Sequence, residues 1–547
     1  MPSTPTTKSQ VQAYRFVLRR MQSALVRKDP VMLHDPMRTH GRATTVGVVL
    51  GALGCLGFLV FGIFKPAPTV PDSGIVISEQ SGQVYVVHQA QGGDKRLIPT
   101  FNVASAKLLS MAQAQEGGDG GQGGGQLPQA PDPADLEPQV VPDTQLVDIG
   151  RERLRGIPDG PPLLPTNEQT IGQNWAVCDN LNYDSSLPDN TARQEAEVTS
   201  QVLAGESGGA RQDELARNQA ILAKNSKGND DTTYLVYRQA DTQAGQGDAV
   251  KAPVNMAGDD PIVNAFNLSE DDVRKMSPSL LEAIPNASGE LKAPKVPGSG
   301  STPQGFDVES APVGTVLEVQ DAGSTTYYLV LQQGVQEINE GAASVMLAAD
   351  ESARTARRVG PGAIAGAPKL SEGDQGWYEL DHLPVAGDLE IVDQELTPHT
   401  CLGWSVEGEG RARDSVTRLY VHNTSPLPKG ANPIDVETPA PDGYNQVDQF
   451  YMQPGHAGVV RSATTRETFD HGPLQLVSDR GIRYSIPDVT TAEWLGLTGD
   501  MFEAAPETIL KMLPAGSSLN YQDVRQTYDS VQVQTPGVDG NAAAAGG

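Results

Sequence analysis

Residues Thr44 to Phe64, TTVGVVLGALGCLGFLVFGIF, form a run of twenty-one residues without a charge, and the organisation of the chain follows from it. A helix rises about 1.5 Å per residue, so a helix of this length covers the ~30 Å hydrocarbon core of a bilayer. The competing interpretation is a cleaved signal peptide, but the charged region before the run exceeds forty residues and Lys65-Pro66-Ala67-Pro68 offers no small-x-small cleavage site. We predict a single transmembrane helix, residues 44–64.

The chain before this span is basic and the chain after it is acidic. Residues 1–43 hold eight basic and two acidic side chains, and the total charge of −28 leaves −34 for the remainder. The positive-inside rule therefore keeps the N-terminus in the cytoplasm and sends the chain from Lys65 onward across the membrane. A strongly acidic exported region argues against nucleic acid and anionic lipid as its partners.

The cytosolic region contains a predicted basic amphipathic helix. Thr7 and Gln10 have the spacing of a capping box. Apolar residues then recur at helical intervals, at Val11, Tyr14, Val17, Leu18, Met21 and Leu25, and four arginines occupy much of the remaining surface, namely Arg15, Arg19, Arg20 and Arg27. Such a helix could lie on anionic headgroups, pack against a cytosolic partner, or act only as a determinant of topology.

Small residues and cysteines give two further expectations. Gly47, Gly51 and Gly54 lie on one face of the predicted span, where they would let another helix approach closely. Cys178 and Cys401 are the only exported cysteines, because Cys55 lies inside the span, and an oxidising compartment favours a disulfide between them. Closing a loop of about 220 residues contributes roughly 5 kcal/mol at most in the chain-entropy model.

The exported region contains an internal repeat. A strand-like unit with a tyrosine occurs four times, around Tyr85, Tyr234, Tyr328 and Tyr484. Each is followed by a stretch that is compatible with a helix, at residues 104–112, 269–284 (interrupted near Pro278), 342–354 and 490–497. Two units also end alike, from Pro278 to Pro285 and from Pro506 to Pro514.

These patterns predict an α+β protein in which one transmembrane helix precedes an elongated extracytoplasmic region of four degenerate αβ repeats around a β-rich central domain. Val416 to His422 and Gly458 to Ser462 are the strands expected in the central domain, which repeats 2 and 3 interrupt. The predicted segments are 1–43 (cytosolic helix), 44–64 (span), 74–165 (repeat 1 with a Gly-rich insertion at 116–126), 168–204 (central domain, first part), 230–300 (repeat 2), 312–370 (repeat 3), 375–475 (central domain, second part), 476–530 (repeat 4) and 531–547 (disordered tail).

The order of these features resembles the EccB family of the actinobacterial type VII (ESX) secretion system. The resemblance rests on residues 6–20 (TTKSQVQAYRFVLRR), 27–36 (RKDPVMLHDP), the span, 83–85 (QVY), 102–108 (NVASAKL), 175–179 (WAVCD), 401–404 (CLGW), 481–484 (GIRY) and 495–497 (LGL). It implies four repeats around a central domain, a disulfide that matches Cys178 and Cys401, and an inner-membrane location with a periplasmic C-terminal part. It also implies assembly with EccC, EccD, EccE, a mycosin protease and other copies of the chain.

No catalytic, cofactor or metal residue is predicted. Members of this family are often labelled ATPases, yet the sequence holds no G-x-x-x-x-G-K-[ST]. Gly205-Glu-Ser-Gly-Gly209 matches a nucleophile elbow but lies in a polar stretch, and His399-Thr-Cys401 would lose its sulfur ligand to a disulfide. The predicted function is a structural core component of the secretion membrane complex that organises its periplasmic part for protein export. The alternatives are an atypical ATPase and a cell-wall-binding membrane protein.

Overall fold

The computed structural model divides the chain into two units, Met1–Thr69 and Val70–Gly547, and each is described by itself. The structure describes residues 7–28, 36–64, 69–89, 93–117, 130–131, 136–184, 186–187, 189–227, 231–239, 249–321, 323–350, 355–437 and 445–529. Most of the predicted Gly-rich insertion and the whole predicted tail, residues 531–547, lie outside these ranges.

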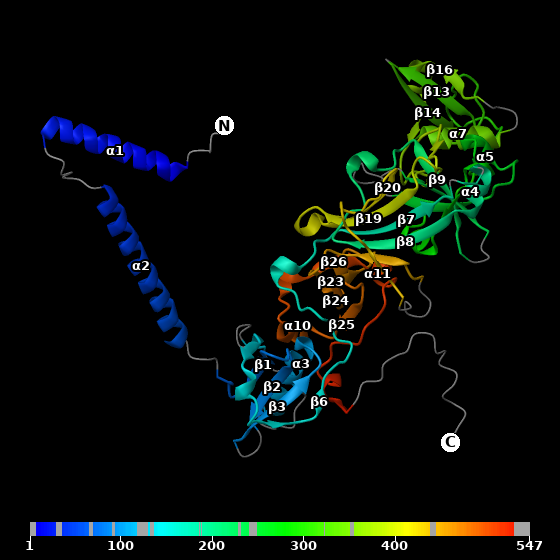
Figure 1. The fold of residues 1–547 in the computed structure, drawn as a ribbon. Helices are drawn as coiled ribbons and strands as arrows, with labels where there is room; N and C mark the ends of the chain where they lie inside the picture. Colours follow the sequence, from blue (N-terminus) through cyan, green and yellow to red (C-terminus); the bar gives the residue numbers. More distant parts are fainter. Residues whose placement is uncertain are drawn as a thin grey trace. The chain divides into compact units, whose positions relative to one another are not determined.

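In its described residues the first unit holds two helices, α1 (Lys8–Arg27) and α2 (Pro36–Phe64), drawn in blue in Figure 1. The predicted capping box begins α1, because the Thr7 N–H donates to Gln10 Oε1 over 3.0 Å and the Thr7 side chain accepts from the Gln10 N–H. α1 ends where Lys28 turns into the left-handed region at φ 54°. α2 contains the predicted span.

The second unit contains four repeats of one topology, numbered here in chain order. Three antiparallel strands are followed by a helix, and a fourth strand then returns parallel to the first. The elements are β1 (Gly74–Ser78), β2 (Val84–Gln89), β3 (Lys95–Thr100), α3 (Val103–Gly117) and β4 (Gln139–Val141) in repeat 1; β9 (Gln219–Asn225), β10 (Thr233–Arg238), β11 (Ala249–Val254), α5 (Pro261–Phe266) and β12 (Arg274–Met276) in repeat 2; β13 (Val316–Asp321), β14 (Ser324–Val330), β15 (Val335–Ile338), α7 (Glu340–Ala349) and β16 (Arg357–Val359) in repeat 3; and β23 (Ala457–Ala463), β24 (Leu474–Ser478), β25 (Arg483–Ile486), α10 (Val489–Leu495) and β26 (Glu503–Pro506) in repeat 4.

Each repeat closes in the same way after its parallel strand. A short helix follows, and the chain then pairs in parallel with the third strand of the repeat. The short helices are η2 (Asp143–Gln145), α6 (Pro278–Ala283), α8 (Pro361–Ile364) and α11 (Glu507–Leu510), and the closing pairs are β5 (Gly150–Arg151) with β3, Asn286 with Lys251, β17 (Lys369–Leu370) with β15, and Ala515 with Arg483. The similar endings that the sequence shows at Pro285 and Pro514 are this closing step, because each proline C=O accepts a hydrogen bond from the facing strand, from the Lys251 and Arg483 N–H respectively.

A six-stranded sheet of order β20-β19-β7-β8-β22-β21 forms the central domain. Its strands are β7 (Trp175–Asn182), β8 (Glu197–Ala204), β19 (His399–Glu407), β20 (Asp414–His422), β21 (Ile434–Asp435) and β22 (Gln449–Tyr451). Repeats 2 and 3 lie between β8 and β19 in the sequence. The remaining elements are β6 (Leu154–Arg155), η3 (Asn167–Gln169), α4 (Asp189–Glu195), η4 (Arg211–Asp213), η5 (Glu270–Asp272), β18 (Glu390–Ile391), η6 (Gly410–Ala412), α9 (Thr468–His471), η7 (Gly499–Met501), η8 (Asp523–Arg525) and β27 (Thr527–Tyr528).

Three apolar cores connect these domains. One core joins the central sheet to repeats 2 and 4, a second joins repeats 2 and 3, and a third joins repeats 1 and 4. The equivalent helices pack in pairs, α3 on α10 and α5 on α7. Figure 1 accordingly shows the teal and yellow central sheet between the orange repeat 4 and the green repeat 2.

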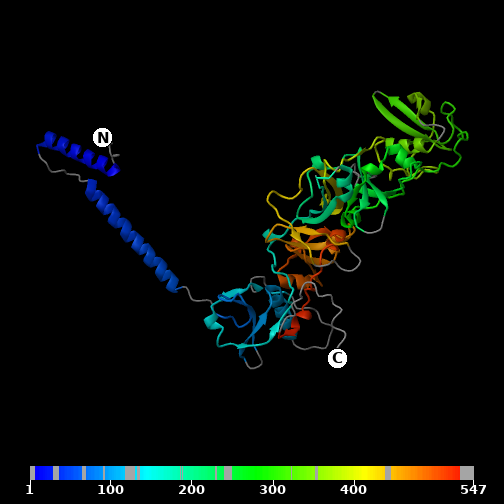
Figure 2. The same ribbon diagram turned by 45° about the vertical axis from the view of Figure 1, so that its right-hand side comes forward.

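The structure corrects three expectations about where segments belong. β23, predicted in the central domain, pairs with β24 and β26 in repeat 4. Repeat 2 begins at β9, before residue 230, and its predicted interrupted helix contains β12 ahead of α6. β27, expected in repeat 4, pairs with β6 in the sheet of repeat 1, so the red end of the chain lies beside the blue repeat in Figure 2. In each case the pairing joins segments that local sequence patterns do not link.

Candidate functional site

The apolar segment of α2 has the length and composition of a membrane span. Gly41–Phe61 has a mean hydropathy of 2.2, and none of it is buried within the chain. A Cβ placed on Gly47, Gly51 or Gly54 would meet no atom within 4 Å. In the described part of the chain the glycine face is therefore uncovered, and it could be approached by another helix.

The apolar stripe of α1 is also uncovered. The predicted apolar positions are exposed, from 38% at Leu18 to 83% at Leu25. Arg15, Arg19, Arg20 and Arg27 lie on the same helix. A stripe of this kind on an otherwise cationic helix is typical of a surface that docks on a partner or a lipid headgroup layer.

A disulfide joins Cys178 and Cys401, which face each other on the antiparallel strands β7 and β19. Both cysteines are fully buried. The loop from Gly205 to Gly209 covers the disulfide, and a Cβ on Gly208 would lie 2.8 Å from the Ala176 Cβ and 3.1 Å from the Cys401 Cβ. The glycines of this loop are thus required by close packing.

The same loop contains the sequence that matches a nucleophile elbow. Ser207 Oγ donates to the Gly209 C=O over 2.8 Å, and His422 Nε2 contacts the Gly208 C=O at 2.8 Å. The histidine nitrogen that a catalytic serine requires is therefore engaged with a backbone carbonyl. This arrangement stabilises the loop.

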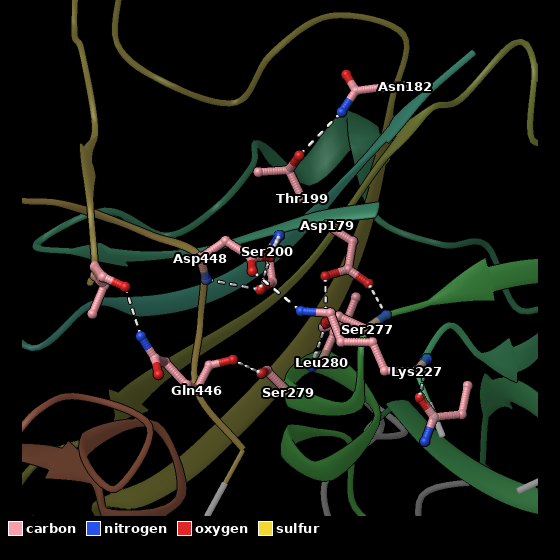
Figure 3. A network of polar contacts seen from close by, with 12 residues as sticks. Asp179, Asn182, Thr199, Ser200, Lys227, Ser277, Ser279, Leu280, Gln446 and Asp448 are labelled. Atoms are coloured by element: carbon pink, nitrogen blue, oxygen red, sulfur yellow. Dashed lines mark hydrogen bonds and ion pairs between the residues drawn. The ribbon is translucent and has the colours of Figure 1, made fainter. Parts of the chain in front are cut away.

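A buried polar network on the opposite face of β7 joins the central sheet to repeat 2, as Figure 3 shows. The Asp179 carboxylate accepts hydrogen bonds from the Ser277 N–H and Oγ–H, both over 2.6 Å. Ser277 is also the N-cap of α6, because its Oγ accepts from the Leu280 N–H over 3.0 Å. Burial raises the pKa of Asp179 to about 7.

Arg274 is the second buried charge of this network. It is 2% exposed, and its guanidinium donates to Thr400 Oγ1 over 2.7 Å and to the Thr397 C=O over 3.1 Å. Burial lowers the pKa of Arg274 to about 10. Asp448 lies at the margin, where it accepts from the Ser200 N–H and Oγ–H and pairs with Lys227 at 3.2 Å. No sequence pattern indicated this network, because Asp179 and Ser277 are 98 positions apart, Arg274 and Thr400 are 126 apart, and Ser200 and Asp448 are 248 apart.

The structure also places the remaining candidates of the sequence. Tyr85, Tyr328 and Tyr484 are 7%, 8% and 2% exposed, so they fill the cores of their repeats, and Tyr234 packs at the edge of the central core. His399 lies beside the disulfide, where burial lowers its pKa. Among the described residues no group of three His, Cys, Asp or Glu side chains is arranged to hold a metal ion.

The comparisons with known proteins cover nearly the whole chain. A family model described as type VII secretion system ESX-1, transport TM domain B, matches residues 3–533. A Mycolicibacterium smegmatis protein named ESX-3 secretion system ATPase EccB3 is 26% identical over 536 residues, covering 96% of this chain and 91% of the relative. A Mycobacterium tuberculosis protein named ESX-5 secretion system ATPase EccB5 is 29% identical over 541 residues, covering 96% and 94%.

Solved structures share the fold. A chain from the structure of an intact ESX-5 inner membrane complex matches with a TM-score of 0.64 at 24% identity, over 98% of this chain and 99% of that chain. A chain from the structure of an EccB3 dimer from the ESX-3 core complex matches with a TM-score of 0.61 at 22% identity, over 82% and 99%. The predicted α+β fold with one apolar helix before a β-rich, multi-sheet region is confirmed.

Proposed function

The chain belongs to the EccB family of type VII secretion proteins, and from this premise we propose that it is a structural core component of an ESX membrane complex. Its exported repeats organise the periplasmic part of the complex, and it catalyses no reaction. The proposal is supported by one observation above all: family similarity extends over the span, the four repeats and the disulfide-linked sheet together.

We propose that the helices of the first unit attach this scaffold to its partners. The span packs through Gly47, Gly51 and Gly54 against other membrane helices. The exposed stripe of α1, with Arg15, Arg19, Arg20 and Arg27 beside it, docks on cytosolic machinery or on headgroups. The family resemblance makes EccC, EccD, EccE, a mycosin protease and further copies of the chain the proposed partners.

The test is native gel electrophoresis of mildly solubilised membranes that carry a tagged copy, followed by mass spectrometry of the band. We expect a very large species that contains EccC, EccD and EccE. Met21→Ser in the apolar stripe of α1 should reduce this species, whereas Gln12→Ser on the polar face of α1 should leave it unchanged. A small species without these partners would contradict the proposal and would direct attention to cell-wall binding.

The proposed orientation places α1 in the cytoplasm and the second unit outside. Eight basic residues before the span support it. In spheroplasts, a membrane-impermeant maleimide should label Thr302→Cys at once and Ser9→Cys only after permeabilisation, because both positions are exposed but lie on opposite sides of the span. Labelling of Ser9→Cys in intact spheroplasts would reverse the assignment.

ATP hydrolysis is the alternative that the names of the relatives raise. A hollow on repeat 2 is lined by three carboxylates, Asp231, Asp260 and Glu270, and by two lysines, Lys224 and Lys292, of which Lys224 pairs with Asp231. The excess of negative charge does not favour a nucleoside triphosphate. The exported location would also offer little ATP. Hydrolysis by the purified full chain should therefore not exceed that of a mock purification, and activity that co-purifies with the chain would overturn this conclusion.

A further inference from the structure

Repeats 2 and 4 pack against the central sheet through equivalent segments. In each, the parallel strand leads directly into the short helix, β12 into α6 and β26 into α11. α6 packs on β7 and β19, and α11 packs on β7 and on α6. Pro285 and Pro514 close the two helices with the same backbone hydrogen bond. Ser277 and Pro506 each lie eight residues before these prolines, so Ser277 of repeat 2 is equivalent to Pro506 of repeat 4. We call the contact between such a segment and the central sheet a joint, and the two joints can be compared position by position.

The two joints differ in chemistry. In repeat 4 the buried side chains that meet the sheet are apolar, namely Ala504, Ala505, Ile509, Leu510, Met512 and Leu513. Glu503, at the position equivalent to Arg274, is only half-buried, and burial raises its pKa. In repeat 2 the equivalent surface carries Arg274 and Ser277, which bind the central sheet through Thr400 and Asp179. The joint of repeat 4 is therefore held mainly by apolar contact with one half-buried carboxyl, and the joint of repeat 2 also depends on two fully buried charged or titratable groups, Asp179 and Arg274.

We propose that the joint between repeat 2 and the central sheet is sensitive to protons: protonation of Asp179 tightens the attachment of α6 to β7, while the joint of repeat 4, whose Glu503 is only half-buried, responds less. Repeats 2 and 3 share one core, so they respond as a pair. The pair formed by repeats 1 and 4 stays fixed to the central sheet.

The groups around Asp179 support this assignment. Arg274 on β12 faces it with a positive charge and Asp448, before β22, acts on it with a negative charge, while Lys227 after β9 pairs with Asp448. Tyr183 after β7 and Asp393 after β18 face Arg274. The neutral neighbours are Ser277 at the start of α6, Thr400 on β19 and Ser200 on β8. Burial lowers the pKa of Arg274 only to about 10 and raises that of Tyr183 to about 12, and the pKa of Asp448 lies below its ordinary value, so none of these three groups changes its charge near neutral pH.

The sign of the effect follows from burial. Burial raises the pKa of Asp179 from 3.8 to about 7, against the Ser277 hydrogen bonds, which lower it. When α6 leaves the sheet, the carboxyl meets water and titrates near its ordinary value. The closed joint therefore holds a proton that the open joint has lost, and this stabilisation is complete below about pH 4 and declines as the pH rises to about 7.

Hydrogen exchange of the full-length protein in detergent micelles tests the proposal. The exchange rates of the Leu280, Leu281 and Ile284 amides in α6 are measured at pH 5.5 and 7.5, and each is divided by its intrinsic rate. We expect the opening of α6 to rise on the order of tenfold between these two pH values. The Lys511, Met512 and Leu513 amides of α11 are the internal control and should show a smaller change, because Glu503 is only half-buried.

Two variants separate the proton effect from general destabilisation. Asparagine has nearly the shape of a protonated aspartic acid but does not titrate, so the pH dependence of hydrogen exchange at α6 should vanish in Asp179→Asn. Ser277→Ala removes a hydrogen bond that lowers the pKa of Asp179, so the pH dependence should extend to higher pH. Exchange at α6 that does not vary with pH in the natural chain, or that varies equally in Asp179→Asn, would overturn the proposal, as would an equal response at α11.

Discussion

Replacing both Cys178 and Cys401 by alanine is expected to lower the free energy of unfolding of the second unit by roughly 5 kcal/mol at most. The two residues are 223 positions apart, and the loop between them contains all of repeats 2 and 3. Without the bond, the unfolded chain regains the freedom of that loop, and the central sheet must hold β7 and β19 together by hydrogen bonds and packing alone. The loss should appear as a lower midpoint of chemical denaturation.

Tryptophan fluorescence can report this effect, because two of the four tryptophans of the chain lie in the central sheet. Trp175 and Trp404 face each other across β7 and β19, three residues from the cysteines on each strand. Their emission should change at a lower denaturant concentration in the double variant. Cys55→Ala, in the span, is the matched control and should leave the transition of the second unit unchanged. An unaltered transition in the double variant would show that the disulfide contributes little to stability.

The sequence predicted those features whose signals are local. The span follows from twenty-one consecutive uncharged residues, and the repeats follow from tyrosine-bearing strands that each precede a helix. The endings at Pro285 and Pro514 are recognisable because the same short helix and the same backbone hydrogen bond follow each parallel strand. The residue bounds that we predict for the individual domains remain proposals, because strand pairing groups the described residues into five sheets whereas the compact units of the chain number two.

The remaining features depend on pairing between distant segments. β23 reads as a strand from its apolar residues, but nothing local distinguishes pairing with β24 from pairing with the central sheet. Asp179 and Ser277 are 98 residues apart, and each is an ordinary polar residue until folding buries both. The sequence therefore could not reveal that one repeat is held by a titratable network and its equivalent mainly by apolar contact.

The C-terminal strap, residues 517–529, is the clearest case of such distant pairing. It leaves repeat 4 and runs over repeat 1, where β27 pairs with β6 and the Tyr528 ring meets the Phe101 ring edge-on at 5.2 Å. Ser517 donates to Asp159 through both its N–H and its Oγ–H. The strap thereby ties the first repeat of the chain to the last.

Ending the chain at Gly516 should therefore weaken the junction between repeats 1 and 4. Leu519 and Val524 are fully buried in the core that these repeats share, and each contributes about 2 kcal/mol by burial. Their removal should lower the free energy of unfolding by about 4 kcal/mol, before the lost hydrogen bonds are counted. Thermal denaturation and hydrogen exchange of α3 and α10 would measure the loss, because these helices pack on each other beneath the strap.

A chain that ends at Asp529 is the matched control for this truncation. It keeps every residue of the strap and removes only residues 530–547, so its thermal transition and the exchange of α3 and α10 should equal those of the full chain. Equal behaviour of the two truncated chains would mean that repeats 1 and 4 hold together through α3 and α10 alone. A loss confined to the shorter chain would establish that repeat 1 is completed by residues more than 350 positions away, as the 358-residue separation of Asp159 and Ser517 implies.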